Sequence, residues 1–352
     1  MANPRSVADM LRRSARALAR ATVVAMEVQR PGFVMTALPE SFASPDADIE
    51  VRILQLAEAI AVDAPLLFTD AVVWYRTALS RRGVADDYLA ATIDALCEVL
   101  VRELPQGAEV VIAPVLALAR RSALAVPSVP PSPIEAPSAY TLVAQRFLLA
   151  MLEGNGDEAL DIVREAIRGG ASVAAIHDHV LAPAQREVGH MWMLGEAPIA
   201  DEHFASQLAG QVLLMLQERV ARPSPTAPHV VAFAVQGNLH ELGVRVIAQR
   251  LQLAGYRVTN LGADLPASDL PWAIGDRPCD LLAVSATMLL HLGQARSLVE
   301  LRDRDLHGKS PILLGGAPFA RIPDLHLRLG AEAGAGDAEA AVLAAHRLAP
   351  IG

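Results

Sequence analysis

An apolar run, a turn and an amphipathic helix follow one another near the middle of the chain, and this order most constrains the fold. Residues 230–235 (Val-Val-Ala-Phe-Ala-Val) predict a buried strand, and Leu242 and Leu251 lie on the apolar face of the helix that follows. The turn between them, residues 236–241, contains His240. Open α/β sheets bind ligands beyond the carboxyl ends of their strands. The sequence therefore places His240 at a ligand-binding edge.

The chain after residue 228 repeats this alternation of strand and helix. Apolar runs predict strands at Val230–Val235, Arg257–Leu261, Leu281–Ser285, Ile312–Leu314 and Ala331–Gly334. Such alternation is typical of a doubly wound parallel sheet, because each crossover helix returns the chain to the same end of the sheet. We expect a Rossmann-like α/β domain over residues 229–352.

Helical periodicity fills the rest of the chain. Residues 139–222 predict a four-helix bundle with helices at Tyr140–Leu152, Gly156–Arg168, Ser172–Leu194 and Ile199–Val220. Residues 1–126 predict an all-helical domain, with a globin-like arrangement as one alternative, from Val7–Val28, Ala47–Ala61, Pro65–Arg81, Asp86–Leu104 and Ala108–Leu124. No histidine precedes His177, so this first domain has no histidine to ligate a haem iron.

Two proline-rich stretches separate these regions. Residues 127–138 and 223–228 cannot continue a helix, because proline lacks the backbone N–H. We therefore expect three domains: an N-terminal helical domain (1–126), a helical bundle (139–222) and an α/β domain (229–352).

Composition disfavours several functional classes. The formal net charge of -9 is unlike the basic surface of a nucleic-acid-binding protein, so no nucleic-acid partner is expected. No apolar run reaches the ~18 residues that a membrane span needs. The chain has two cysteines, Cys97 and Cys279, which imply no disulfide framework and fit a reducing compartment. We expect a cytoplasmic protein with no membrane partner.

Polar and glycine residues also follow two other predicted strands. Ser285-Ala286-Thr287 ends the third strand, and Gly315-Gly316 ends the fourth. Together with His240 and Gly243 in the first turn, this series resembles the signature of the cobalamin-binding domain family. That signature has an acid-x-His-x-x-Gly turn, a Ser-x-Leu or Ser-x-Thr, and a Gly-Gly, each at a successive strand end.

The resemblance implies a role for each of these residues. His240 would be the lower ligand of cobalt, and Ser285 and Thr287 would line the slot for the nucleotide tail of the cofactor. Gly315 and Gly316 would let the tail approach the backbone, since no Cβ intervenes. The family usually has an acid two residues before the histidine, where this chain has Asn238. We expect the amide oxygen of Asn238 to accept the second imidazole proton without a charge, which makes the imidazole a weaker donor to cobalt.

A second motif lies in the predicted bundle. Trp192 is followed, after nine intervening residues, by Glu202-His203, across a connection that contains Gly195 and Pro198. The end of the helix before Gly195 and the start of the helix after Pro198 would bring these residues together. The pattern resembles the light-sensing adenosylcobalamin proteins, in which such residues cap the upper face of the corrin and hold the adenosyl group.

One position departs from some of those receptors. They carry a histidine after the tryptophan that ligates cobalt once light has cleaved the cobalt–carbon bond, and this chain has Met193. We interpret His177, His179 and His190 as structural or surface histidines, because they point to different sides of a regular helix.

The domain order as a whole resembles the photocobilins, photoreceptors that hold cobalamin and biliverdin. This implies a sensor in which photolysis of adenosylcobalamin shifts the bundle against the α/β domain and changes the oligomeric state of a homo-oligomer, which an unidentified output protein reads. No bilin motif is evident in residues 1–126. We interpret Cys97 as a core cysteine, with covalent attachment of a bilin as the alternative. A pigment could also be held without a covalent bond by Trp74, Tyr75, Arg76, Arg81 and Arg82.

Two other functions share this architecture. One is a corrinoid carrier that shuttles methyl groups, against which Trp192 and Glu202-His203 argue, because a methyl group needs no polar cap. The other is an anti-repressor whose cobalamin is structural. Neither of these, nor the sensor, is itself an enzyme.

Overall fold

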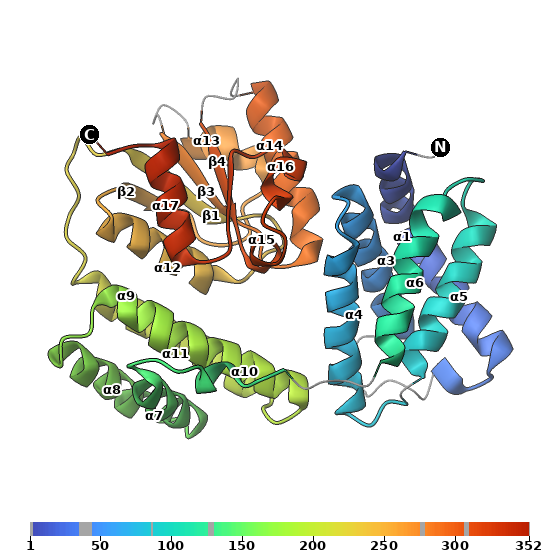
Figure 1. Ribbon diagram of the computed structural model, residues 1–352, viewed down its shortest axis with the longest axis horizontal. Coiled ribbons are helices and arrows are strands. Elements are labelled where there is room, and N and C mark those ends of the chain that lie inside the picture. Colours follow the sequence, from blue (N-terminus) through green and yellow to red (C-terminus); the bar gives the residue numbers. More distant parts are fainter. Residues whose placement is uncertain are drawn as a thin grey trace. The chain divides into compact units, whose positions relative to one another are not determined.

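The computed structural model (Figure 1) describes residues 3–34, 44–85, 87–125, 130–274, 279–305 and 310–351. The chain divides into two compact units, Met1–Val129 and Pro130–Gly352. Each unit has its own core, and each is described by itself below.

The described part of the first unit is helical. Its helices are α1 (Pro4–Gln29), α3 (Pro45–Ala61), α4 (Pro65–Ser80), α5 (Tyr88–Glu103) and α6 (Glu109–Leu124). Proline is the first residue of α1, α3 and α4, where the missing N–H has no helical partner to lose. Leu11, Ile53 and Leu96 are among the fully buried residues of the core. The prediction of an all-helical N-terminal region is confirmed.

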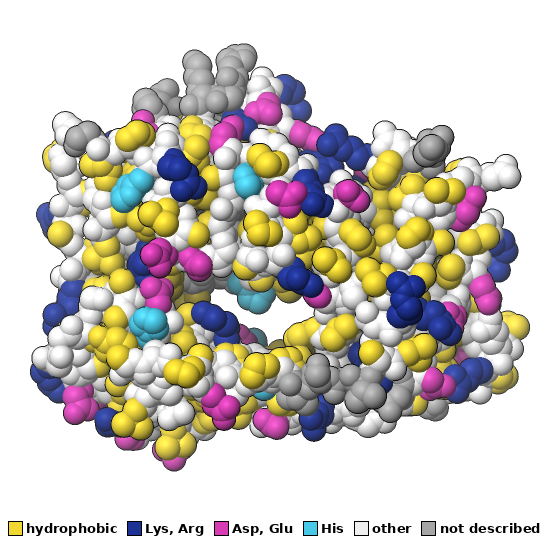
Figure 2. Space-filling model, in the orientation of Figure 1, with side chains coloured by type: hydrophobic (Ala, Val, Ile, Leu, Met, Phe, Trp, Pro, Cys, Tyr) yellow, Lys and Arg dark blue, Asp and Glu magenta, His cyan; other side chains and the backbone are white. Residues whose placement is uncertain are grey.

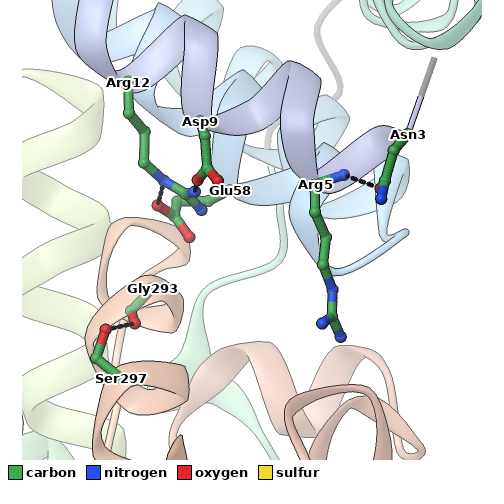
Figure 3. A network of polar contacts seen from close by, with 7 residues as sticks. All are labelled: Asn3, Arg5, Asp9, Arg12, Glu58, Gly293 and Ser297. Atoms are coloured by element: carbon green, nitrogen blue, oxygen red, sulfur yellow. Dashed lines mark hydrogen bonds and ion pairs between the residues drawn. The ribbon is translucent and has the colours of Figure 1, made fainter.

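Arg12 joins α1 to α3 inside this unit (Figure 3). Its Nε donates to Glu58 Oε1 at 2.7 Å, and its Nη1 donates to Asp9 Oδ1 at 2.7 Å. The Glu58 side chain is only 8% exposed. Because desolvation offsets much of the attraction between buried charges, the pair adds little net stability, but removing either partner would leave a buried charge alone.

The second unit begins with the helical bundle. Its elements are α7 (Thr141–Leu152), α8 (Gly156–Arg168), α9 (Val173–Ile176), a π-helical segment (His177–Leu181), α10 (Ala182–Leu194) and α11 (Ile199–Gln217). Phe147, Val163 and Val212 are fully buried in its core.

The predicted helix over Ser172–Leu194 is confirmed as an unbroken helical run from Val173 to Leu194, but its centre widens into the π segment. Pro183 follows that segment and has no N–H to offer the carbonyl of His179. The N–H of Ala182 instead donates to the carbonyl of His177, five residues back. The proline therefore converts one turn of the expected α-helix into a π turn.

The rest of this unit is a parallel sheet of β1 (His229–Ala234), β2 (Arg257–Asn260), β3 (Leu281–Ser285), β4 (Ile312–Gly315) and β5 (Ala333–Ala335). Its strand order is β2-β1-β3-β4-β5, with every pair parallel. The doubly wound parallel sheet is confirmed, with β5 shifted by two residues at its start from the predicted Ala331–Gly334.

Helices cover both faces of this sheet (Figure 1). α12 (Glu241–Leu253) and α17 (Ala338–Leu348) pack on one face against Val230, Ala232 and Leu281. The connection from β1 to β2 runs one way along the sheet, and the connections from β2 to β3, β3 to β4 and β4 to β5 run the other way. These three connections carry α13 (Leu270–Ile274), α14 (Leu292–Asp305), α15 (Ala317–Arg321) and α16 (Leu325–Leu329). Because crossovers are right-handed, the chain changes face between β1 and β3, and the crevice at that switch point lies beyond their carboxyl ends.

α12 also contacts the bundle through buried polar groups. His177 Nε2 lies 2.9 Å from Gln249 Oε1, and Gln249 Nε2 donates to the Leu213 carbonyl at 2.6 Å. Arg250 pairs with Asp178 of the π segment. The π turn therefore lies where the bundle meets the sheet.

Acidic and basic side chains are mixed with apolar ones over the face seen in Figure 2. Across the described residues, no helix combines the length and apolar character needed to cross a bilayer.

The buried imidazole of His177 predicts a pH-dependent stability. Burial, followed by the nearby charge of Arg250, lowers its pKa from 6.5 to about 4, although its hydrogen bond to Gln249 opposes this shift. The unfolded chain takes up a proton as the pH falls below 6.5, and the folded chain does so only near pH 4, so stability is lost across that window. We expect the free energy of unfolding to fall by about 3 kcal/mol from this group.

Urea unfolding between pH 7 and pH 4.5 measures this loss. His177→Gln keeps a hydrogen-bonding group and cannot titrate, so it should flatten the pH dependence. His179→Gln, at the exposed neighbouring histidine, is the matched control and should leave it unchanged. A His177→Gln variant with the full wild-type pH dependence would contradict the expectation.

Candidate functional site

The turn after β1 lies at the switch point of the sheet. β1 ends at Ala234, which pairs with Ser285 at the end of β3, and α12 begins at Glu241. Gly237 has a φ of 81°, a conformation that favours glycine. Its N–H donates to Asp264 Oδ1 at 2.7 Å. Asp264, which follows β2, therefore holds the turn from one side.

His240 occupies the N-cap position of α12, and its side chain is exposed. The sequence predicted this position at the carboxyl edge of the first strand. A neutral imidazole here can offer a nitrogen lone pair to a metal outside the sheet.

Asn238 is fully buried beneath this turn. Its Nδ2 donates to the Ser285 carbonyl at 3.1 Å and to Thr287 Oγ1 at 3.0 Å, and its Oδ1 accepts the backbone N–H of His240 at 3.2 Å. These partners fix which end of the amide is oxygen, since a carbonyl can only accept and an N–H can only donate. The expected bond from Asn238 to the His240 ring is replaced by one to the His240 backbone.

The loops after β3 and β4 supply the residues that were predicted to line the slot for the nucleotide tail. Ser285 and Thr287 are half-buried, and their hydroxyl oxygens are 3.5 Å apart. Gly316 has a φ of 124°, and a Cβ there would lie 2.4 Å from the Ala286 carbonyl oxygen. A Cβ on Gly315 would meet the Ala335 carbonyl oxygen at an ordinary 3.5 Å. Gly316 is thus required for the two loops to pack, which the sequence alone did not indicate.

We call Asn238, His240, Ser285 and Thr287 the lower-ligand group. The structure joins Asn238, Ser285 and Thr287 directly by hydrogen bonds and ties Asn238 to the backbone of His240.

Sequence reasoning missed His291. It ends the short helix Leu289–His291 after β3, and the residue is 4% exposed. Burial and the charge of nearby His240 lower its pKa, although a hydrogen bond to the Gly237 backbone opposes this shift. The residue lies in a leucine-rich helical run, so its sequence context gave no sign of this position.

The second motif maps to the adjoining ends of two helices. Trp192 is half-buried in the last turn of α10, and Glu202 and His203 lie in the first turns of α11. Ser206 Oγ donates to Glu202 Oε1 at 2.9 Å, and His203 Nδ1 lies 2.9 Å from Glu202 Oε2. We call Trp192, Glu202 and His203 the capping group. Packing of α10 against α11 keeps these helix ends together.

The neighbouring histidines have structural contacts. His190 Nδ1 lies 3.5 Å from Glu187 Oε1, and His179 stacks on Tyr140 with ring centroids 5.9 Å apart. Met193, which follows Trp192, is 3% exposed.

The edge of the sheet that carries His240 fits a flat ring that needs one protein nitrogen below its metal. The His240 side chain is exposed, and a Cβ on Gly243, in the first turn of α12, would meet nothing within 4 Å. A corrin supplies the equatorial nitrogens of its cobalt, so one imidazole completes the lower side. Among the described residues, no group of three or more His, Cys, Asp or Glu gathers as a site for a free metal ion.

Comparison with known proteins gives two family matches. One B12 binding domain family matches residues 228–345, and a second B12 binding domain family matches residues 143–217. The matched regions overlap the α/β segment and the helical bundle.

Individual relatives match over part of the chain. Dimethylamine corrinoid protein 3 of Methanosarcina mazei is 30% identical over 121 residues, which cover 34% of this chain and 71% of that protein. The HTH-type transcriptional repressor CarA of Myxococcus xanthus is 33% identical over 153 residues, which cover 44% of this chain and 50% of the repressor. The chain thus spans about half the length of this repressor.

A solved structure shares the fold. The monomethylamine corrinoid protein of Methanosarcina barkeri superposes with a TM-score of 0.53 at 20% identity, over 59% of this chain and 99% of that protein. This likeness confirms the fold of the bundle and sheet.

The bonds of Asn238 predict that an acid at this position is harmful. In Asn238→Asp, a carboxylate oxygen would replace the Nδ2 that faces the Ser285 carbonyl, which leaves two acceptors opposed in a buried place. We expect a loss of about 3 kcal/mol in the free energy of unfolding at pH 7. Burial raises the pKa of the new carboxyl group above ~3.9, so the penalty should shrink as the pH falls and the group becomes a donor.

Asn260→Asp is the matched control, because Asn260 is an exposed residue at the end of β2 whose Oδ1 accepts the Gly262 N–H. An aspartate at position 260 would still accept the Gly262 N–H through a carboxylate oxygen. Equal stability losses in the two variants would contradict the assignment of the Asn238 amide.

Proposed function

We propose, from the premise that this chain belongs to the B12-binding family of corrinoid proteins, that it is a light sensor built on adenosylcobalamin. Cobalamin binding is the property that the family matches support directly, and the prediction of a cobalamin-binding chain is confirmed at that level. Light sensing and its output are the proposal.

The capping group is the observation that carries the proposal. An aromatic ring and a carboxylate at adjoining helix ends suit a nucleoside, which offers a flat base to cover and ribose hydroxyls to bind. A methyl group offers neither. Glu202 is 41% exposed and already held by Ser206, so its orientation is fixed before any ligand arrives.

Bound adenosylcobalamin supplies a cobalt–carbon bond that light breaks. Trp192 would cover the upper face of the corrin, Glu202 would accept a hydrogen bond from the adenosyl group, and His203 would add a polar contact. On the opposite side, His240 would donate a ring nitrogen to cobalt. Ser285 and Thr287 would line the tail slot, where short hydroxyls bind without filling space.

α12 offers a physical connection between these two sides. Its first turn follows His240, and its C-terminal half contacts the bundle through Gln249 and Arg250. Arg245 Nη2 also donates to the Gly210 carbonyl of α11 at 3.0 Å. We propose that loss of the adenosyl group shifts the bundle along this helix, which changes the oligomeric state that a protein partner reads.

Biliverdin, the second chromophore that the photocobilin resemblance implies, is the finer part of this proposal and would be held by the N-terminal unit. Burial and the charges of Asp94 and Glu98 raise the pKa of Cys97, which disfavours the thiolate that covalent attachment needs. We propose that the bilin is held there without a bond to Cys97.

A corrinoid carrier for methyl transfer is the second candidate. Its support is the similarity to the dimethylamine and monomethylamine corrinoid proteins. A third candidate, an anti-repressor, has the similarity to the repressor CarA in its favour.

Light should change the adenosylcobalamin-loaded protein. We expect green light to convert its absorption spectrum to one like hydroxocobalamin and to shift its elution volume in size-exclusion chromatography. Biliverdin added to one sample tests the second chromophore, which should co-elute with the protein as a red-absorbing band. If the spectrum changes but the elution volume does not, light sensing through assembly is wrong and the carrier becomes the better account.

Glu202→Gln separates a sensor from a methyl carrier. Loss of a charge-assisted hydrogen bond costs about 2 kcal/mol, so adenosylcobalamin should bind roughly thirtyfold more weakly. Methylcobalamin should bind as to the wild type, because it makes no such bond. Absorption titrations with each cobalamin measure both constants.

Glu196→Gln provides the matched control, because Glu196 is exposed in the connection between α10 and α11. That variant should change neither constant. Equal weakening of the two cobalamins by Glu202→Gln would argue against the nucleoside cap.

A further inference from the structure

We propose that Asp264 is a positioning residue, which fixes the turn that carries His240 toward cobalt. This role rests on the proposed function only in taking His240 as the lower ligand, and it holds whether or not the protein senses light. Asp264 belongs to the connection after β2, on the opposite side of β1 from the loop that carries Ser285 and Thr287. Its contacts with the turn are hydrogen bonds of both its side chain and its backbone.

The connection after β2 departs from regular pairing just before Asp264. Ala232 pairs with Asn260, but Val235 pairs with Leu265, so the β2 side has two extra residues over this stretch. The Leu265 N–H donates to the carbonyl of the last residue of β1 at 3.0 Å, so the pairing resumes after the interruption. Extra residues at the edge of a sheet redirect side chains and are common beside functional sites.

Asp264 also has a left-handed backbone. Among the described residues other than glycine, only Asp264 and Asp63 have a positive φ, of 58° and 52°. A side chain crowds the backbone in this region, although aspartate and asparagine enter it more readily than other residues. Such a conformation persists where the surrounding contacts hold it, which is often at functional sites.

Two hydrogen bonds run in opposite directions between Asp264 and the turn. The Gly237 N–H donates to Asp264 Oδ1 at 2.7 Å, and the Asp264 N–H donates to the Asn238 carbonyl at 3.2 Å. One residue therefore accepts from the first of these two turn residues and donates to the second. The backbone of residues 237 and 238 is thereby fixed on the β2 side.

This hold reaches His240 through Asn238. The Asn238 side chain accepts the His240 N–H at 3.2 Å, so Asp264 fixes the backbone of the same residue whose side chain holds His240. Gly237, with a φ of 81°, has the backbone freedom of a glycine, and the bond to the Asp264 carboxylate restricts it. Loss of outer contacts that orient a ligating imidazole typically costs roughly 10- to 100-fold in affinity for the bound group.

Two substitutions separate the side chain of Asp264 from its backbone. Asp264→Asn keeps an oxygen that can accept the Gly237 N–H, and asparagine tolerates the left-handed region. Asp264→Gly adopts that region without strain but has no side-chain acceptor. A purely structural role, in which only the backbone conformation matters, predicts that both variants bind cobalamin like the wild type.

Asp63→Gly is the matched control. Asp63 is the other left-handed aspartate, and it lies between α3 and α4 in the first unit. The same change of residue type is therefore made there at a position outside the sheet and its loops.

The readouts are the dissociation constant for hydroxocobalamin from absorption titration, the thermal unfolding of the apoprotein, and the nitrogen splitting in the electron paramagnetic resonance spectrum of bound cob(II)alamin. We expect Asp264→Gly to bind roughly tenfold or more weakly and to lose part of the splitting, with the apoprotein still folded. Asp264→Asn should bind within about threefold of the wild type and keep the splitting, because the acceptor remains. Asp63→Gly should change neither the affinity nor the splitting.

Wild-type affinity and splitting in Asp264→Gly would overturn the positioning role, and so would equal losses in Asp264→Gly and Asp264→Asn. A loss in Asp63→Gly as large as that in Asp264→Gly would do the same, because it would reflect general destabilisation. His240→Ala marks the loss of the ligand itself. If the wild type and His240→Ala give the same splitting, His240 is not the ligand and the positioning role falls with it. If both splitting and affinity follow the expected order while light has no effect, only the sensor function fails.

Discussion

The placement of the lower-ligand group depends on one buried amide, that of Asn238. Parallel pairing aligns Ala234 of β1 with Ser285 of β3, which brings the turn after one strand beside the end of the other. The Asn238 side chain then joins the Ser285 carbonyl, the Thr287 hydroxyl and the His240 backbone in one set of hydrogen bonds. An amide can do this because it both donates and accepts. A carboxylate cannot, which gives a physical reason for an asparagine at a position where the related signature has an acid.

The same turn is coupled to the bundle through α12. This helix begins directly after His240, and it receives polar contacts from the π segment and from α11 along its length. The π segment exists because Pro183 withdraws one donor from the helix, and π turns are often found at functional sites. Here it presents His177 and Asp178 to Gln249 and Arg250. A displacement of the bundle would therefore move α12 and, with it, the turn that carries His240, the residue that would hold cobalt.

The sequence predicts the sheet well, because buried parallel strands are short apolar runs and their carboxyl ends carry the polar residues. The position of His240 followed from that pattern alone. The π turn was missed because apolar periodicity through Ile176, Val180 and Ala184 is the same whether or not one donor is absent. His291 was missed because its burial beside the turn after β1 arises only when the loops after β1 and β3 meet. The donor to the Asn238 oxygen was expected to be the His240 ring and is the His240 backbone N–H, because the same amide is also held by Ser285 and Thr287.

The central claim is that His240 is the protein nitrogen below cobalt. The most direct measurement is the electron paramagnetic resonance spectrum of cob(II)alamin bound to protein in which only histidine carries ¹⁵N. Ligation by His240 predicts that each cobalt line splits into a doublet from ¹⁵N, and that His240→Ala abolishes it. A triplet from ¹⁴N in the labelled protein would contradict the claim, because the ligand would then be the base of the cofactor itself.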